Sequence, residues 1–220
     1  MKPLTKNIPI AFISIVLLII AVFYVTPKVY AFSYGSFAAK VNNNRQIGNP
    51  NANVTVVIYT DFQCSWCRKF EENDLPYIMS NYVKTKKVLL QFRDFPLTLI
   101  HKYAFKSAEY ADCAAFQGKS EYMQTRGLLY KDQSEWSEIG DLYYFFKTKA
   151  GKIVNLKKEE ACVKSGIAKK LIHGDMTSGI NAEVEGTPTL FIYKGLTLYK
   201  KVTGYIPFTS LNKILSGALS

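Results

Sequence analysis

The chain has 220 residues, of which 48% are hydrophobic, and a formal net charge of +11. This length is enough for one domain with a sizeable core. The lysines are scattered along the sequence, which favours a solvated basic surface, or attraction to an anionic membrane, over nucleic-acid binding.

The N-terminal residues 1–31 carry a targeting pattern. Lys2 and Lys6 precede an uncharged apolar run over residues 8–25, and no acidic residue occurs before Asp61. This pattern predicts export, with the segment either cleaved as a signal peptide after Ala31 or retained as a membrane anchor, since the run just reaches the roughly 18 residues of a transmembrane candidate. Either outcome places the remaining chain in the oxidising periplasm.

Residues 32–53 are rich in Asn, Gly and Pro and show no periodicity, which predicts a tether. Residues 54–98 follow as a strand–helix–strand unit. The continuous apolar run 54–59 predicts a buried strand. A helix is expected from Ser65 to Tyr82, bent near Pro76, and a second strand over residues 88–93.

The long segment 99–180 is predicted to be an inserted helical domain. Small and apolar residues recur at helical spacing from Ile100 to Ala115, and Gly118 is expected to end that helix. Further helices are expected at residues 121–130, 138–149, 156–164 (with Asn155 as N-cap) and 167–180.

Residues 181–220 complete the predicted fold. Strands are expected at residues 189–193 and 198–202, joined by a tight Lys194-Gly195 turn, before a closing helix over residues 211–219. A βαβ unit and a ββα unit separated by helices predict an α/β domain with one mixed sheet flanked by helices.

The four residues Cys64-Ser65-Trp66-Cys67 lie between a predicted strand and a predicted helix. The free N–H groups of a helix N-terminus stabilise an anion, so Cys64 is expected to ionise readily and act as the exposed nucleophile. Cys67, one turn later, could then resolve a mixed disulfide as the buried thiol. Zinc sites use the same spacing, so a metal-binding module is the alternative of a different class.

A second motif, Glu185-Gly186-Thr187-Pro188-Thr189, is at least a turn that starts a strand. In this order of elements, the chain resembles the DsbA-like branch of the thioredoxin-fold family of thiol–disulfide oxidoreductases. The matching segments are Gly48-Asn49-Pro50, Asp61 to Cys67, Arg93 to Leu97, Cys113 to Lys119, and Gly186 to Thr189.

The resemblance implies a thioredoxin fold and a periplasmic enzyme that introduces disulfide bonds into exported proteins through Cys64 and Cys67. It implies a cis Thr187–Pro188 bond beside Cys64, with Thr187 and Pro188 binding substrate. It further implies a membrane quinone-linked reoxidant as partner, no metal, and no cofactor beyond the redox-active disulfide. A disulfide isomerase or reductase is the near alternative, and a membrane-tethered copper or zinc chaperone a remote one. The tether has no room for a dimerisation domain, which favours a monomer.

Several residues depart from the family pattern or stand alone. Ile58 occupies the position where relatives often bury an acidic proton relay, and Asp61, the nearest carboxylate, is either a substitute for it or a capping residue. Trp66 is expected to offer an exposed apolar surface to substrates. His101 and His173 are isolated, which favours structural roles.

Cys113 and Cys162 have no C-x-x-C partner and flank the inserted helices. In an oxidising compartment a structural disulfide between them is the favoured interpretation, closing a loop of about 50 residues. Two buried free thiols or a second, regulatory redox pair are the alternatives.

Overall fold

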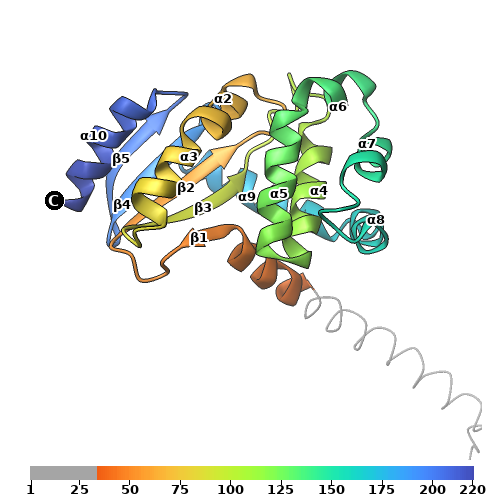
Figure 1. Cartoon of the computed structure of the whole chain (residues 1–220), viewed down its shortest axis with the longest axis horizontal. Coiled ribbons are helices and arrows are strands. Elements are labelled where there is room, and N and C mark those ends of the chain that lie inside the picture. Colours follow the sequence, from red (N-terminus) through yellow and green to blue (C-terminus); the bar gives the residue numbers. More distant parts are fainter. Residues whose placement is uncertain (1–33) are drawn as a thin grey trace, which may run out of the picture. The chain divides into compact units, whose positions relative to one another are not determined.

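The computed structural model of the protein describes residues 34–220, so the predicted signal peptide or anchor at 1–31 lies outside the described residues. Five strands form one mixed sheet in the order β1-β3-β2-β4-β5 (Figure 1). Strand β2 runs parallel to β3, and the other pairs are antiparallel. The predicted mixed sheet of an α/β domain is confirmed. The strands are β1 (Gln46–Gly48), β2 (Val54–Thr60), β3 (Val88–Asp94), β4 (Thr189–Lys194) and β5 (Thr197–Thr203).

The central strand β2 shows why the sheet has two unequal faces. Val54, Val56 and Ile58 are completely buried, whereas Thr55 and Val57 between them are only half-buried. Successive side chains of a strand point to opposite faces, so one face is fully covered and the other partly open.

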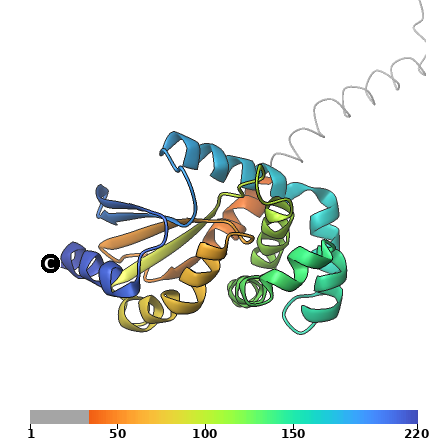
Figure 2. The ribbon, with the colours of Figure 1, turned by 90° about the horizontal axis from the view of Figure 1, so that it is seen from above.

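Helices cover both faces of the sheet. Figure 2 shows α2 (Ser65–Asn73), α3 (Leu75–Ile78) and α10 (Phe208–Leu219) on one face and α9 (Ile167–Asn181) on the other. The bend predicted near Pro76 is confirmed, because the proline opens the short helix α3, which continues as a π-helical turn over Met79–Val83.

The remaining helices form the insertion between β3 and β4, together with α9. They are α4 (Ala104–Gln117), α5 (Lys119–Lys131), α6 (Gln133–Ile139), α7 (Leu142–Lys149) and α8 (Leu156–Ser165). The sequence-based boundary at 180 assigned α9 to this insertion alone, but α9 also packs on the sheet. A side chain at Gly179 would meet the ring of Phe95 at 2.6 Å, so only glycine allows this close approach.

The prediction of a tether over residues 32–53 is wrong from Lys40 onward. Lys40–Ser220 forms one compact unit, residues 40–44 are helical, and β1 pairs with β3 as the edge strand. Loop-like composition hid this strand, because three residues are too few to show a period of two.

Arg45 anchors this segment in the core. It is 1% exposed, and its guanidinium group contacts Asp94 of β3 (2.6 Å), Asp112 of α4 (3.1 Å) and Asp175 of α9 (2.9 Å). One cation therefore joins the sheet, the insertion and the covering helix. Its Nη1 and Nη2 atoms make these contacts, whereas Nε has no hydrogen-bond partner among the described residues.

Two predicted helices have different bounds in the structure. Residues 138–149 are not one helix, because Gly140 adopts a φ of +70° and ends α6 before α7 begins. The helix predicted from Ile100 starts only at Ala104, and the side chain of Ile100 is 73% exposed in the preceding turn. Within residues 34–220, no helix is both long and apolar enough to cross a membrane.

Candidate active site

Cys64 is the N-cap residue of α2, at the junction that the sequence predicts between strand and helix. Its thiol lies 3.3 Å from the carbonyl oxygen of Thr187, to which it can donate a hydrogen bond. Cys64 is only 6% exposed and Cys67, one turn further along, is fully buried. Both cysteines are buried, so Cys64 is not the exposed thiol that the sequence predicts, although it is the less buried of the two.

The pKa values of the two thiols are shifted in opposite directions. A hydrogen bond from the Cys67 side chain is the largest cause that lowers the pKa of Cys64 to about 6, against the effect of burial. The Thr187 side chain and the backbone N–H groups of Trp66 and Cys67 also lower it. Burial raises the pKa of Cys67 well above its ordinary value, and the negative charge of Cys64 adds to this. Near neutral pH the reduced site therefore pairs a Cys64 thiolate with a Cys67 thiol.

The Thr187–Pro188 peptide bond is cis, as the resemblance implies. Thr187 is 7% exposed, and its hydroxyl oxygen contacts no other polar partner among the described residues besides the two sulfurs whose pKa it lowers. The structure thus brings Thr187 to Cys64 across 123 residues of sequence. Substrate binding by Thr187 and Pro188 remains a prediction.

The loop before Cys64 is fastened by Asp61. One carboxylate oxygen of Asp61 accepts a hydrogen bond from the N–H of Gln63 (2.7 Å). The other contacts the N–H of Leu97 (2.8 Å) and Nδ1 of His101 (2.7 Å). Asp61 is therefore a buried residue that fixes the loop before α2 without capping the helix, and His101 contacts it.

The inserted helices hold the same loop from the other side. The side-chain amide of Gln133 donates to the carbonyl oxygens of Phe62 (2.7 Å) and Cys64 (3.0 Å), and the hydroxyl of Tyr130 donates to that of Asp61 (3.4 Å). Sequence reasoning missed both residues. Each lies about 70 positions away from its partner in an ordinary helical pattern, which carries no local signal.

A buried ion pair lies behind the loop. Ile58 is fully buried, as its place in β2 requires, so no carboxylate occupies this position. Instead, Arg126 of α5 contacts Glu71 of α2 at 2.8 Å and stacks over the ring of Phe92 at 4.0 Å. Burial raises the pKa of Glu71, and the charge of Arg126 opposes that rise. The pair ties the helix that carries Cys67 to the insertion.

Comparison with known proteins agrees with this geometry. The sequence model described as Thioredoxin matches residues 40–201. The chain belongs to the thioredoxin family.

Individual relatives of this thioredoxin-family protein fall into two groups. It is 27% identical over 145 residues to the Na(+)/H(+) antiporter NhaA 1 of Mycolicibacterium gilvum, covering 66% of this chain but only 22% of the antiporter. The chain thus spans about a fifth of that relative's length. It is 26% identical over 155 residues to the probable disulfide bond formation protein D of Bacillus cereus, covering 69% of this chain and 70% of that protein.

The fold is that of DsbA-like proteins. The crystal structure of alpha-DsbA1 from Wolbachia pipientis matches with a TM-score of 0.68 and 23% sequence identity, covering 80% of this chain and 90% of the other. At this identity the likeness shows the shared fold, a thioredoxin fold with a helical insertion.

Two stacked aromatic side chains lie beside the cysteine motif of this thioredoxin-family protein. Trp66 is 54% exposed and stacks on Tyr205, with ring centroids 5.7 Å apart. The ammonium group of Lys69 lies over both rings, at 5.2 and 4.8 Å. Trp66, Tyr205 and Lys69 give the surface at the start of α2 an apolar and partly cationic character.

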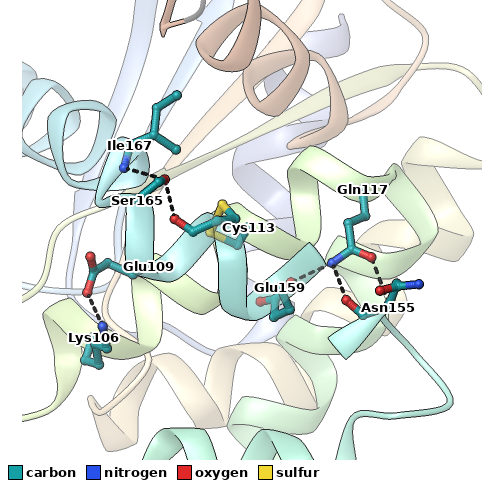
Figure 3. Close-up of a disulfide and its surroundings, with 9 residues drawn as sticks. Lys106, Glu109, Cys113, Gln117, Asn155, Glu159, Ser165 and Ile167 are labelled. Atoms are coloured by element: carbon teal, nitrogen blue, oxygen red, sulfur yellow. Dashed lines mark hydrogen bonds and ion pairs between the residues drawn. A yellow bond between two sulfur atoms is a disulfide. The ribbon is translucent and has the colours of Figure 1, made fainter. Parts of the chain in front are cut away.

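Cys113 of α4 and Cys162 of α8 form a disulfide bond, the arrangement that the sequence analysis favoured (Figure 3). Their Cα atoms are 5.7 Å apart and Cys113 is fully buried. Cys64 and Cys67 are both free thiols. The bridge and the reactive pair therefore belong to different parts of the fold.

His173, the other isolated histidine, packs against the ring of Phe105.

Proposed function

We propose that this protein is an exported thiol–disulfide oxidoreductase that introduces disulfide bonds into other exported proteins through Cys64 and Cys67. The single observation that carries the proposal is the environment of Cys64. Cys64 is the N-cap residue of α2, and its thiol lies beside the Thr187 carbonyl and has a pKa of about 6. A stable thiolate favours the reduced form of the enzyme, which makes the oxidised form a better oxidant.

The proposed reaction is a two-electron exchange. A substrate thiolate attacks Sγ of Cys64 in the oxidised enzyme, the Cys64–Cys67 bond breaks, and Cys67 leaves as a thiolate that takes up a proton. A second substrate thiolate then attacks the substrate sulfur of this mixed disulfide. Cys64 leaves as its stable thiolate, the substrate has gained a disulfide, and the enzyme holds both electrons.

The raised pKa of Cys67 explains why the steps occur in this order. The Cys67 thiolate is costly, so the sulfur is protonated as it leaves. A neutral, buried thiol attacks the mixed disulfide slowly, which leaves time for the second substrate thiol to complete the transfer. With Ile58 at the acidic position, protons reach Cys67 by way of water.

The proposal includes a location and partners. The basic, apolar N-terminus supports export to the periplasm, as a cleaved or anchored protein. The substrates are unfolded or folding exported proteins, and Trp66 with its neighbours offers them an apolar contact. A membrane quinone-linked partner returns the electrons, the Cys64–Cys67 disulfide is the one redox group, and the protein acts as a monomer.

The decisive experiment is oxidative refolding of a reduced, unfolded protein with stoichiometric oxidised enzyme. Formation of substrate disulfides should accompany the release of two thiols per enzyme, and Cys64→Ser should abolish it. The Cys113→Ser/Cys162→Ser variant, which keeps the reactive pair, is the matched control. If substrate disulfides form no faster with the oxidised enzyme than without it, the oxidase proposal is wrong.

The reductase and isomerase alternatives make different predictions, and two further measurements test them. A reductase has a Cys64–Cys67 potential close to that of cytosolic thioredoxins, at roughly −270 mV, and an oxidase a considerably higher one. Equilibration with glutathione buffers separates the two. An isomerase would also recover activity from a scrambled substrate, which an oxidase alone does not do.

A further inference from the structure

A small cavity lies in the inserted helices, apart from the residues that form the candidate active site. It has a volume of about 140 Å³. Tyr110 of α4, Tyr143 and Phe146 of α7, and Leu156, Glu159 and Glu160 of α8 line it. A cavity of about 150 Å³ is large enough for benzene, so this one fits a ligand of a few heavy atoms or the end of one side chain.

Glu159 is the unusual member of this lining. It is 1% exposed, and one carboxylate oxygen accepts a hydrogen bond from Nε2 of Gln117 at 2.8 Å (Figure 3). The other oxygen, Oε1, is buried and contacts no hydrogen-bond donor among residues 34–220. None of the described basic side chains forms an ion pair with Glu159 either. A buried carboxylate with an unused oxygen is costly unless a cation or donor reaches it.

Among the charged side chains that line the cavity, Glu160 is paired with Lys164 and Lys147 and Lys157 are exposed, so Glu159 is the buried one. On α4, Glu109 pairs with Lys106 at 3.0 Å, and on α8 Glu160 pairs with Lys164. Burial raises the pKa of Tyr110, and the charges of Glu159, Asp141, Glu109 and Glu160 raise it further, so the potential at this wall is negative. Lys147 and Lys157 line the cavity as well, but both are exposed, so water and salt screen their charges.

We propose that this cavity binds a small organic ammonium ion, with Glu159 as its counterion and the aromatic rings as its walls. Aromatic faces attract ammonium groups through the negative face of the ring, and such rings recur where proteins bind methylated ammonium ions. Glu159 lines this cavity, and its buried carboxylate provides the opposite charge. Such a ligand could be a free ammonium compound or the ammonium end of a partner's side chain. Both would present the same charged group to Glu159.

The disulfide bond fixes the two walls of this cavity. Cys113 follows Tyr110 by one turn of α4, and Cys162 follows Glu159 by one turn of α8. The covalent link therefore holds the tyrosine and the carboxylate at a constant separation, which limits the entropy lost on binding.

Tetramethylammonium is the probe that tests the proposal, because its charge does not depend on pH. Titration of the oxidised full-length protein, followed by the amide NMR signals of α4, α7 and α8, should give saturable shifts. Glu159→Gln should weaken binding at least tenfold, while Glu135→Gln, at an exposed glutamate of α6 that pairs with Lys149 and does not line the cavity, should change it little. The neutral analogue tert-butanol should bind more weakly than the cation.

Binding should also depend on pH in one direction. Burial raises the pKa of Glu159 to about 8, so below that value the cation must displace a proton. Affinity for tetramethylammonium should therefore rise roughly tenfold per pH unit up to about pH 8 and then level off. In Glu159→Gln this dependence should vanish.

Three results would overturn the proposal: no saturable shifts in the parent protein, equal binding of tert-butanol and tetramethylammonium, or unchanged binding in Glu159→Gln. If Glu159→Gln does not fold, Tyr143→Ala decides, because Tyr143 is 48% exposed and its removal leaves the core intact. This variant should bind the cation several-fold more weakly, and unchanged affinity would contradict the assignment. Free amines and lysine-containing peptides in competition then distinguish the two ligand sources.

Discussion

The side-chain amide of Gln133 donates a hydrogen bond to the carbonyl oxygen of Cys64 at 3.0 Å, across 69 residues of sequence. The same amide also donates to the carbonyl of Phe62. The first residue of α6 thus supports the backbone that carries the reactive sulfur. The inserted helices are therefore part of the active-site framework as well as an addition to the fold.

Gln133→Leu should remove both hydrogen bonds and leave two buried carbonyl groups unpaired. We expect a loss of about 1–3 kcal/mol in the free energy of unfolding, measured by urea denaturation. Gln124→Leu is the control, because Gln124 donates a hydrogen bond to Ser120 on the exposed face of α5. Equal stability of the two variants would show that Gln133 does not support the loop.

The reactivity of Cys64 should depend on the hydrogen bond from Cys67. In the reduced parent, alkylation of Cys64 should reach half of its maximal rate near pH 6, since the thiolate forms above its pKa. Cys67→Ala removes the largest cause of this low pKa, so the midpoint should move upward. Cys67→Ser keeps a donor and should move it less. Identical midpoints in all three proteins would contradict this explanation.

The Cys113–Cys162 bond should stabilise the fold without taking part in exchange. Replacing both residues by serine should lower the free energy of unfolding by about 2–4 kcal/mol, because the bridge closes a loop of 49 residues. Guanidinium denaturation measures this loss. After mild reduction, mass spectrometry should find Cys64 and Cys67 reduced and the bridge intact. Reduction of the bridge first would instead indicate a regulatory redox pair.

Arg45→Met should be among the most destabilising substitutions in the protein. It would leave Asp94, Asp112 and Asp175 buried without their shared cation, at a cost of about 3–5 kcal/mol. Arg93→Met is the milder control, since Arg93 lies 3.6 Å from Asp175 and its side chain is 25% exposed. Thermal unfolding of both variants compares them directly.

The loss of stability caused by Arg45→Met should be smaller at acidic pH. Burial already raises the pKa of Asp94 in the parent to about 6. A carboxyl group with a raised folded-state pKa binds its proton more tightly when folded, so its contribution to stability falls as pH rises from about 4 through 6. Without the guanidinium group this pKa should rise further. A deficit that is constant between about pH 4 and 7 would argue against charge as its cause.

The parts of the fold that could be predicted from sequence are those with local signals. The apolar run of β2, the glycine at Gly118 and the N-cap Asn155 each fix an element through its own residues, and the structure confirms all three. The cysteine pair was found in the same way, because its chemistry lies in a short motif, whereas the cis bond at Pro188 was implied by the family resemblance.

The remaining features depend on contacts distant in sequence. Arg45 stands in a segment whose composition resembles a linker, and only the three aspartates from other elements give it a place in the core. Gln133 and Arg126 look like ordinary helical residues until the loop and Glu71 lie against them. Such pairs have no period or motif, so one sequence does not reveal them.

The disulfide bond between α4 and α8 has a consequence for how the protein matures. Under the proposed function, each newly made copy presents Cys113 and Cys162 as reduced thiols, and these are substrates of the kind that the proposed reaction oxidises. Finished copies can therefore complete unfinished ones, which would make the production of stable protein autocatalytic. The amount of finished protein would then rise slowly at first, from a few molecules oxidised by other means. It would rise faster as the number of finished copies grows.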